Sequence, residues 1–240
     1  MRGTSVIPAR EFWTPEYWCR YCESANPFRQ YKQERDRSLA IELLKPQDGE
    51  LVLEVGCGYG RISRSLTACA RIRMVAIDES EAMINYWKTA VFLGMACQGD
   101  ATRLPFKSAR FDAVVCTGVL MHLPDQRQAL KELCRVLRPG GRLVISANNL
   151  LSPFALPVWC WMKLKSKVHQ AYRSPWFYRR SLTRLGLEVT RMVGDTVLAV
   201  APMPHGVRWV LSLVRSLDRH LEKPPLCYFA YEIWLIGVKA

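Results

Sequence analysis

The sequence predicts an α/β fold whose central feature is a doubly wound, mostly parallel sheet. Half of the 240 residues are hydrophobic, which is enough to build one substantial core. Short apolar stretches alternate along the chain with longer segments that have the periodicity of helices. Near-continuous apolar strands of this kind are buried on both faces, which is typical of parallel strands joined by covering helices.

Five apolar stretches within the first 150 residues are predicted to be strands, because they are short and rich in Val, Ile and Leu. Three segments between them have helical spacing. The Arg-Pro-Gly-Gly sequence at 138–141 is predicted to end the last of these helices, because Pro cannot continue a helix and Gly accepts a left-handed turn. The predicted strands are 51–55, 74–77, 95–98, 111–116 and 142–147, and the predicted helices are 61–70, 81–92 and 126–137.

The two ends of the chain and one internal segment differ from this alternation. We predict a helical and aromatic N-terminal cap segment over residues 1–45, a main domain over 46–240, and an irregular cap or lid insertion over 148–174. These helical cap segments would lie over the sheet. The other predicted elements are helices at 26–44, 175–185 and 207–221, a strand at 187–193, and a last, antiparallel strand within 228–238.

The charge is strongly positive and uneven. The formal net charge is +13, and residues 133–187 contain no Asp or Glu. Such a stretch suggests a surface that faces anions, for example a carboxylated or phosphorylated substrate, a phospholipid head group or nucleic acid. The alternative is the solvated surface of a generally basic protein.

The nine cysteines are scattered, which favours reduced thiols over a disulfide framework. The one close pair, Cys19 and Cys22, has no second pair nearby, so we predict no metal site. No secretory leader and no apolar run approaching 18 residues is evident. We therefore expect a cytoplasmic protein, with peripheral membrane contact left open.

A glycine-rich loop indicates where a ligand would bind. Gly56, Gly58 and Gly60 follow the first predicted strand and precede a helix, an arrangement that lets a ligand approach the backbone. Asp78 ends the second strand, where a carboxylate can accept both ribose hydroxyls. Asp100 follows the third strand, where an adenine amino group would lie. Helix capping is the alternative role for both aspartates.

Together these motifs resemble the class I S-adenosylmethionine-dependent methyltransferases, and within them the type that acts on small molecules. The resemblance covers about residues 51–147 and implies a Rossmann-like, seven-stranded sheet with an antiparallel last strand. It is carried by Leu-Glu-Val-Gly-Cys-Gly-Tyr-Gly at 53–60, Asp-Glu-Ser-Glu-Ala-Met at 78–83, Gly-Asp-Ala-Thr-Arg-Leu-Pro-Phe at 99–106 and Leu-Arg-Pro-Gly-Gly at 137–141. A nicotinamide-dependent oxidoreductase shares the loop and the ribose carboxylate but leaves the last two motifs unexplained. A cofactor-binding module without catalysis stays open as well.

The resemblance implies S-adenosyl-L-methionine as cofactor, S-adenosyl-L-homocysteine as product, and a set of cofactor-binding residues. Glu54 would anchor the amino group, the three glycines would lie along the methionine part and Asp78 would hold the ribose. Glu79 and Met83 would border the adenine, although Met83 has core packing as an equal alternative. Asp100 and Ala101 would contact the adenine amino group, and Cys116 and Thr117 would line the other side of the donor.

The acceptor side is less defined by the sequence. His122 follows the fourth strand and is a candidate general base, with a structural role as the alternative. The substrate-binding candidates are Trp18, Tyr31, Trp159, His169 and Tyr172. We expect a small specialised metabolite, anionic or aromatic, with O-methylation ahead of N- or C-methylation. A lipid or quinone precursor at a membrane surface and an RNA or protein substrate stay as alternatives, although no stable nucleic-acid partner is expected. The oligomeric state is not predicted.

Overall fold

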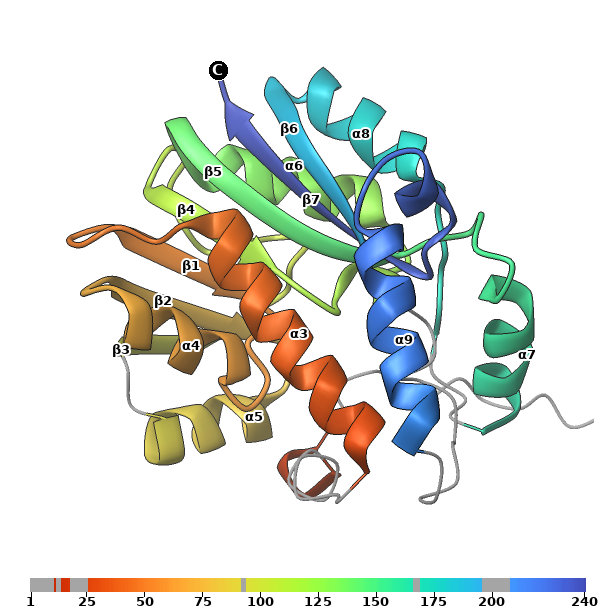
Figure 1. Cartoon of the computed structure of the whole chain (residues 1–240). Helices are drawn as coiled ribbons and strands as arrows, with labels where there is room; N and C mark the ends of the chain where they lie inside the picture. Colours follow the sequence, from red (N-terminus) through yellow and green to blue (C-terminus); the bar gives the residue numbers. More distant parts are fainter. Residues whose placement is uncertain (1–10, 12–13, 18–25, 92–93, 166–168, 196–207) are drawn as a thin grey trace, which may run out of the picture.

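A seven-stranded sheet forms the centre of the protein (Figure 1). The computed structural model describes residues 11, 14–17, 26–91, 94–165, 169–195 and 208–240. The strand order is β3-β2-β1-β4-β5-β7-β6, and only β7 runs antiparallel to its neighbours, which confirms the predicted mostly parallel sheet with an antiparallel last strand. The strands are β1 (Leu51–Val55), β2 (Arg73–Asp78), β3 (Gly94–Gln98), β4 (Phe111–Cys116), β5 (Leu137–Asn148), β6 (Leu187–Asp195) and β7 (Glu232–Lys239).

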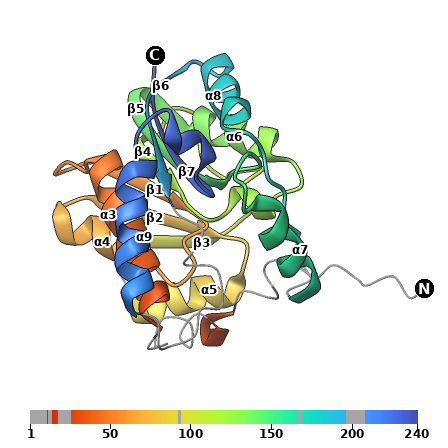
Figure 2. The same ribbon diagram turned by 45° about the vertical axis from the view of Figure 1, so that its right-hand side comes forward.

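Helices cover both faces of this sheet, which gives a three-layer arrangement (Figures 1 and 2). One face packs against α6 and α8, and the other against α3, α4 and α5. The helices are α3 (Pro27–Leu44), α4 (Arg61–Cys69), α5 (Glu81–Tyr86), α6 (Gln126–Val136), α7 (Ala155–Lys165), α8 (Pro175–Arg184) and α9 (Arg208–Leu221), with short turns η1 (Trp87–Val91), η2 (Leu120–His122) and η3 (Leu226–Phe229). None of the helices within the described residues combines the length and the apolar character that a membrane crossing requires.

The N-terminal helix α3 shares the core of the sheet. Its start is capped by Asn26, whose side chain accepts hydrogen bonds from the backbone N–H groups of Phe28 and Arg29. Near its other end Leu39 and Leu43 are fully or almost fully buried against the sheet. The core thus continues across residue 45, and the division of the chain into a cap segment and a main domain at this residue stays a prediction.

Two local structures differ from the prediction. The Pro-Gly-Gly sequence does not separate α6 from β5, because β5 already begins at Leu137 and the pairing with β4 shifts around these residues, with Gly140 at φ 71°. The segment expected to be irregular contains α7. Pro157 is compatible with this helix because it lies in the first turn, where a backbone N–H has no partner within the helix.

Candidate active site

A cavity of about 340 Å³ lies at the carboxyl ends of the strands, beside β1, where the strand order reverses. This is the usual ligand position in an open α/β sheet. Loops after β1, β2, β3 and β4 form one part of its wall. The start of β7 and the helix α3 form the other part. The predicted residues that line it are Glu54, Gly56, Gly58, Asp78, Glu79, Met83, Asp100, Ala101, Thr117 and His122.

The glycine loop shows two different reasons for glycine. At Gly56 φ is 74°, and an added Cβ would overlap the side chain of Val119, so this glycine allows close packing of the loop. At Gly58 φ is 49°, and no protein atom lies within 4 Å of the position of an added Cβ. Because Gly58 also lines the cavity, the open space at its Cα belongs to the ligand side. Gly60 precedes α4 and packs on Val91 and Trp87 rather than lining the cavity.

Asp78 links the glycine loop to the end of β2. Its Oδ2 accepts a hydrogen bond of 2.9 Å from Gly58 N, and its Oδ1 accepts one of 2.9 Å from Ser80 N. Burial raises the pKa of Asp78, whereas these backbone N–H groups lower it. The helix cap of α5 is Ser80, whose Oγ accepts from Met83 N, so Asp78 does not serve as the cap.

Glu54 projects from β1 toward the start of α4. Its Oε2 accepts a 3.0 Å hydrogen bond from Ser63 N and a second one from Ser63 Oγ. Burial raises the pKa of Glu54 to about 7, with the Ser63 contacts acting in the opposite direction. The side chain therefore changes charge near neutral pH, and a cationic group in the cavity would favour its ionised form.

The remaining predicted cofactor residues lie at the other strand ends. Asp100 accepts hydrogen bonds from Thr102 N (2.7 Å) and Thr102 Oγ1 (2.8 Å), which holds a turn after β3 without capping a helix. Met83 is 1% exposed, so it belongs to the core as well as to the cavity wall. Cys116 is different, because its side chain is fully buried inside the sheet and does not line the cavity. Burial raises the pKa of its thiol to about 12.

His122 ends the turn η2 on the wall of the cavity. Its Nδ1 lies 3.2 Å from the carbonyl oxygen of His169, and since a carbonyl can only accept, Nδ1 carries the proton in this hydrogen bond. In the neutral ring, Nε2 is then the unprotonated nitrogen. Burial lowers the pKa of His122 below its ordinary value of 6.5, so this neutral tautomer predominates at neutral pH.

Of the other predicted acceptor residues, Trp159 and Tyr172 make hydrogen bonds to residues that line the cavity. Tyr31 donates to Asp218 Oδ2 at 2.6 Å, and Trp159 Nε1 donates to the carbonyl of Gln170 at 3.3 Å. The hydroxyl of Tyr172 lies 2.6 Å from that of Tyr231. None of these three side chains, nor that of His169, is among the described residues that line the cavity, and Trp18 lies outside the described residues. Their roles as substrate contacts stay predictions.

Several lining residues were not anticipated from the sequence. Ser146 and Asn148 come from the end of β5, Gln170 precedes α8, and Tyr231 lies directly before β7. Asn148 Nδ2 donates to the hydroxyl of Tyr231 at 3.4 Å. We call this end of the cavity, where these four residues place amide and hydroxyl groups, the acceptor end.

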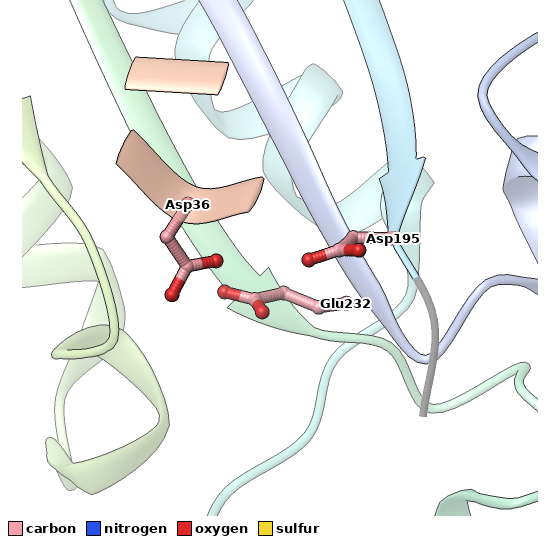
Figure 3. A group of neighbouring side chains, drawn as sticks. All are labelled: Asp36, Asp195 and Glu232. Atoms are coloured by element: carbon pink, nitrogen blue, oxygen red, sulfur yellow. The ribbon is translucent and has the colours of Figure 1, made fainter. Parts of the chain in front are cut away.

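A charged cluster closes the acceptor end. Figure 3 shows Asp36, Asp195 and Glu232 brought together from α3, β6 and β7. Their carboxylate oxygens lie within 4.8 Å of one another, near enough to share a metal ion. Lys32 Nζ, however, contacts all three carboxylates, at 2.7 Å from Asp195, so a lysine supplies a cation there. Although burial alone would lower it, these carboxylates raise the pKa of Lys32 well above its usual value.

The comparisons with known proteins agree with this geometry. Residues 53–145 match the family model of a methyltransferase domain. An O-methyltransferase of Penicillium expansum is 34% identical over 120 residues, which cover 48% of this chain and 43% of the relative. A ubiquinone biosynthesis O-methyltransferase of Coxiella burnetii is 30% identical over 146 residues, covering 59% and 58% of the two chains. The aligned part thus spans about half the length of these curated relatives.

A solved structure extends the likeness to the whole fold. Magnesium protoporphyrin IX methyltransferase of Synechocystis, crystallised with bound S-adenosylhomocysteine, matches with a TM-score of 0.66 at 18% identity, covering 96% of this chain and 98% of that one. At this identity the likeness concerns the fold. Residues 53–145 therefore match a methyltransferase domain, and the chain has the fold of this S-adenosylhomocysteine-bound methyltransferase, which agrees with the resemblance found in the sequence.

Proposed function

We propose that this protein transfers a methyl group from S-adenosylmethionine to a hydroxyl group of a small, polar acceptor. The observation that carries the proposal is one cavity in which the glycine loop, Asp78 and Asp100 lie beside a neutral histidine, His122. The two curated relatives are both O-methyltransferases, which supports the choice of oxygen as the acceptor atom.

The residues present fit the cofactor. The Gly58 Cα faces open space. Asp78 ends β2 and Asp100 follows the neighbouring strand β3, where their carboxylates would hold ribose hydroxyls and an adenine amino group. Glu54 would hold the protonated amino group of the methionine part. The positive charge of that amino group would favour the ionised form of the Glu54 carboxyl group. Bound S-adenosylmethionine supplies an electrophilic methyl group on a sulfonium, so the protein mainly orients the acceptor and excludes water.

His122 would remove the proton of the acceptor hydroxyl. Its Nδ1–H is held by the carbonyl of His169, which fixes the ring and leaves Nε2 as the proton acceptor. Burial keeps the ring neutral at physiological pH, as a general base requires. The proton moves from the acceptor oxygen to Nε2, so His122 becomes an imidazolium. Solvent then takes up this proton and restores the neutral ring.

The lining of the acceptor end supports a polar acceptor. Gln170, Asn148 and Tyr231 offer amide and hydroxyl groups, and Glu232 offers a carboxyl group whose pKa is raised by burial. The indole ring of Trp159, which would suit a flat polycyclic compound, does not line the cavity. We therefore favour a hydroxylated compound of modest size over the aromatic or anionic acceptor expected from the sequence.

A methyl-transfer assay tests the proposal. The purified chain is incubated with isotope-labelled S-adenosylmethionine and with two matched sets of compounds, one polyhydroxylated and one flat and apolar. We expect labelled ethers from the first set, and we expect His122→Ala to form them far more slowly while it still binds S-adenosylhomocysteine. Labelled N-methyl or C-methyl products, or donor binding without any transfer, would contradict the assignment.

A further inference from the structure

Most of the exposed large hydrophobic side chains lie in two segments that are not used by the proposed reaction. Among the described residues eight such side chains are exposed, and six of them fall in residues 150–176 and 226–229. We call these six the apolar face. They are Leu150, Phe154, Leu156, Trp176, Leu226 and Phe229.

Direct contacts join the two segments into one surface. Asn149 Nδ2 donates to the carbonyl oxygens of Tyr228 (2.8 Å) and Ala230 (2.7 Å). The ring of Trp176 stacks on that of Tyr228, with centroids 5.5 Å apart. Figures 1 and 2 agree with this, since both place α7, the start of α8 and the dark-blue turn before β7 on one side of the molecule.

The surroundings of the apolar face are basic. Residues 133–187 carry no Asp or Glu, and α8 exposes Arg179, Arg180 and Arg184. Lys223 precedes the turn η3 and is exposed as well. The neighbouring acid, Glu222, is held at 2.5 Å by Arg35 of α3, so its charge is compensated. Apolar side chains bordered by cations without acids have the chemistry that anionic bilayers bind.

We propose that the apolar face docks the protein peripherally on an anionic lipid bilayer. Phe, Trp and Leu side chains would enter the interface, and the arginines and lysine would contact the head groups. The face lies next to the acceptor end, because Ala155 of α7 and Tyr172 pack with Tyr231, which lines the cavity. Docking would thus bring the acceptor end close to the membrane surface. This inference does not depend on the chemistry proposed for His122.

Vesicle sedimentation with the full chain tests the docking. Phosphatidylcholine vesicles with phosphatidylglycerol should bind the protein, and vesicles of phosphatidylcholine alone should bind it much less. Higher salt should weaken the binding. The double variant Leu156→Glu with Phe229→Glu should lower the affinity by roughly a hundredfold, about tenfold for each apolar group that can no longer enter the interface. Arg179→Glu with Arg180→Glu should weaken binding only to the anionic vesicles.

Met95→Glu is the matched control. Met95 is also an exposed large hydrophobic residue, at 73%, but it belongs to β3 at the far edge of the sheet, so its substitution should leave vesicle binding unchanged. Titration with S-adenosylhomocysteine reports whether each variant is folded. If a variant of the apolar face does not fold, the dependence of wild-type vesicle binding on lipid charge and on salt decides whether the protein docks on anionic bilayers. No binding to anionic vesicles, an equal loss in Met95→Glu, or light scattering that shows a dimer for the wild type and a monomer for the face variant would overturn the proposal.

Discussion

The Nδ1 atom of His122 lies 3.2 Å from the carbonyl oxygen of His169, a residue 47 positions further along the chain. The contact ties the turn after β4 to the segment that precedes α8. The neighbouring backbone is held in the same way, since Ala171 N donates to the carbonyl of Met121 at 2.8 Å. The imidazole is therefore oriented by the backbone of a second segment, and its tautomer, unprotonated at Nε2, is defined before any acceptor arrives.

Replacing His122 by Ala should separate turnover from donor binding. Loss of a general base typically costs about 10² to 10⁴ in rate, so kcat should fall by that order. The affinity for S-adenosylhomocysteine, measured by calorimetry, should stay within about threefold because no cofactor contact is removed. His220→Ala is the control, since His220 is exposed on α9 and its Nδ1 contacts the Ser216 carbonyl within the helix. Equal rates for the two variants would remove His122 from the mechanism.

The pH dependence of kcat should report the protonation of the His122 imidazole. The base must be neutral, and burial lowers its pKa below 6.5, so kcat should be constant at neutral pH and fall only as the pH drops below that value. The acidic limb should be absent from the residual activity of His122→Ala. A limb centred above pH 7 would show that another group, or a charged histidine, governs the rate.

The two glycines should respond differently to alanine. Gly58→Ala places a methyl group in open cavity space, so it should cost only about 1–2 kcal/mol of folding free energy for its left-handed backbone while it reduces donor binding by at least tenfold. Gly56→Ala adds an overlap with Val119 and should destabilise the fold by about 2–4 kcal/mol. Urea unfolding and titration with S-adenosylhomocysteine distinguish the two. Similar stability losses would mean that the cavity side of the loop is assigned wrongly.

The sheet could be predicted because its signals are local. The strand β4 was predicted over the residues that form it, and α6 was predicted to within one residue. The predicted elements were wrong where the residue composition of a segment suggested another structure than the one it forms. Prolines in the segment around α7 suggested irregular structure, although one in the first helical turn is tolerated. The start of β5 was missed because Pro-Gly-Gly usually marks a turn between elements, whereas here it forms an irregularity within the pairing to β4.

Lys32 should be essential for stability. Its replacement by Met leaves Asp195 and Glu232 buried without the cation that they contact, while Asp36 keeps its ion pair with Arg61 at 2.9 Å, and the change should cost about 3–5 kcal/mol in urea unfolding. Burial already raises the pKa of Glu232 above 4.5, so the folded state binds a proton more readily than the unfolded chain does. The loss should therefore be smaller at pH 5 than at pH 8. Lys107→Met, at an exposed position, is the control, and equal losses for both variants would contradict this account.

The site was predictable only in its cofactor half. The glycine loop, Asp78 and Asp100 are each recognisable from a few neighbouring residues, and all of them except Gly60 of the loop line the cavity. The acceptor end depends instead on contacts across the whole chain, such as that of Lys32 with Glu232, 200 residues away. No short pattern marks such residues. Aromatic composition pointed to Trp159 and Tyr172, but it cannot tell a side chain on the wall from one behind it.

Donor binding is the claim on which the rest depends. Calorimetric titration of the wild-type chain with S-adenosylhomocysteine should give one site with a Kd of about 1–100 μM. Asp78→Asn, which keeps the shape of the side chain but loses its charge, should weaken this affinity by at least tenfold. Absence of heat, a preference for a nicotinamide dinucleotide, or unchanged binding by Asp78→Asn would contradict the account.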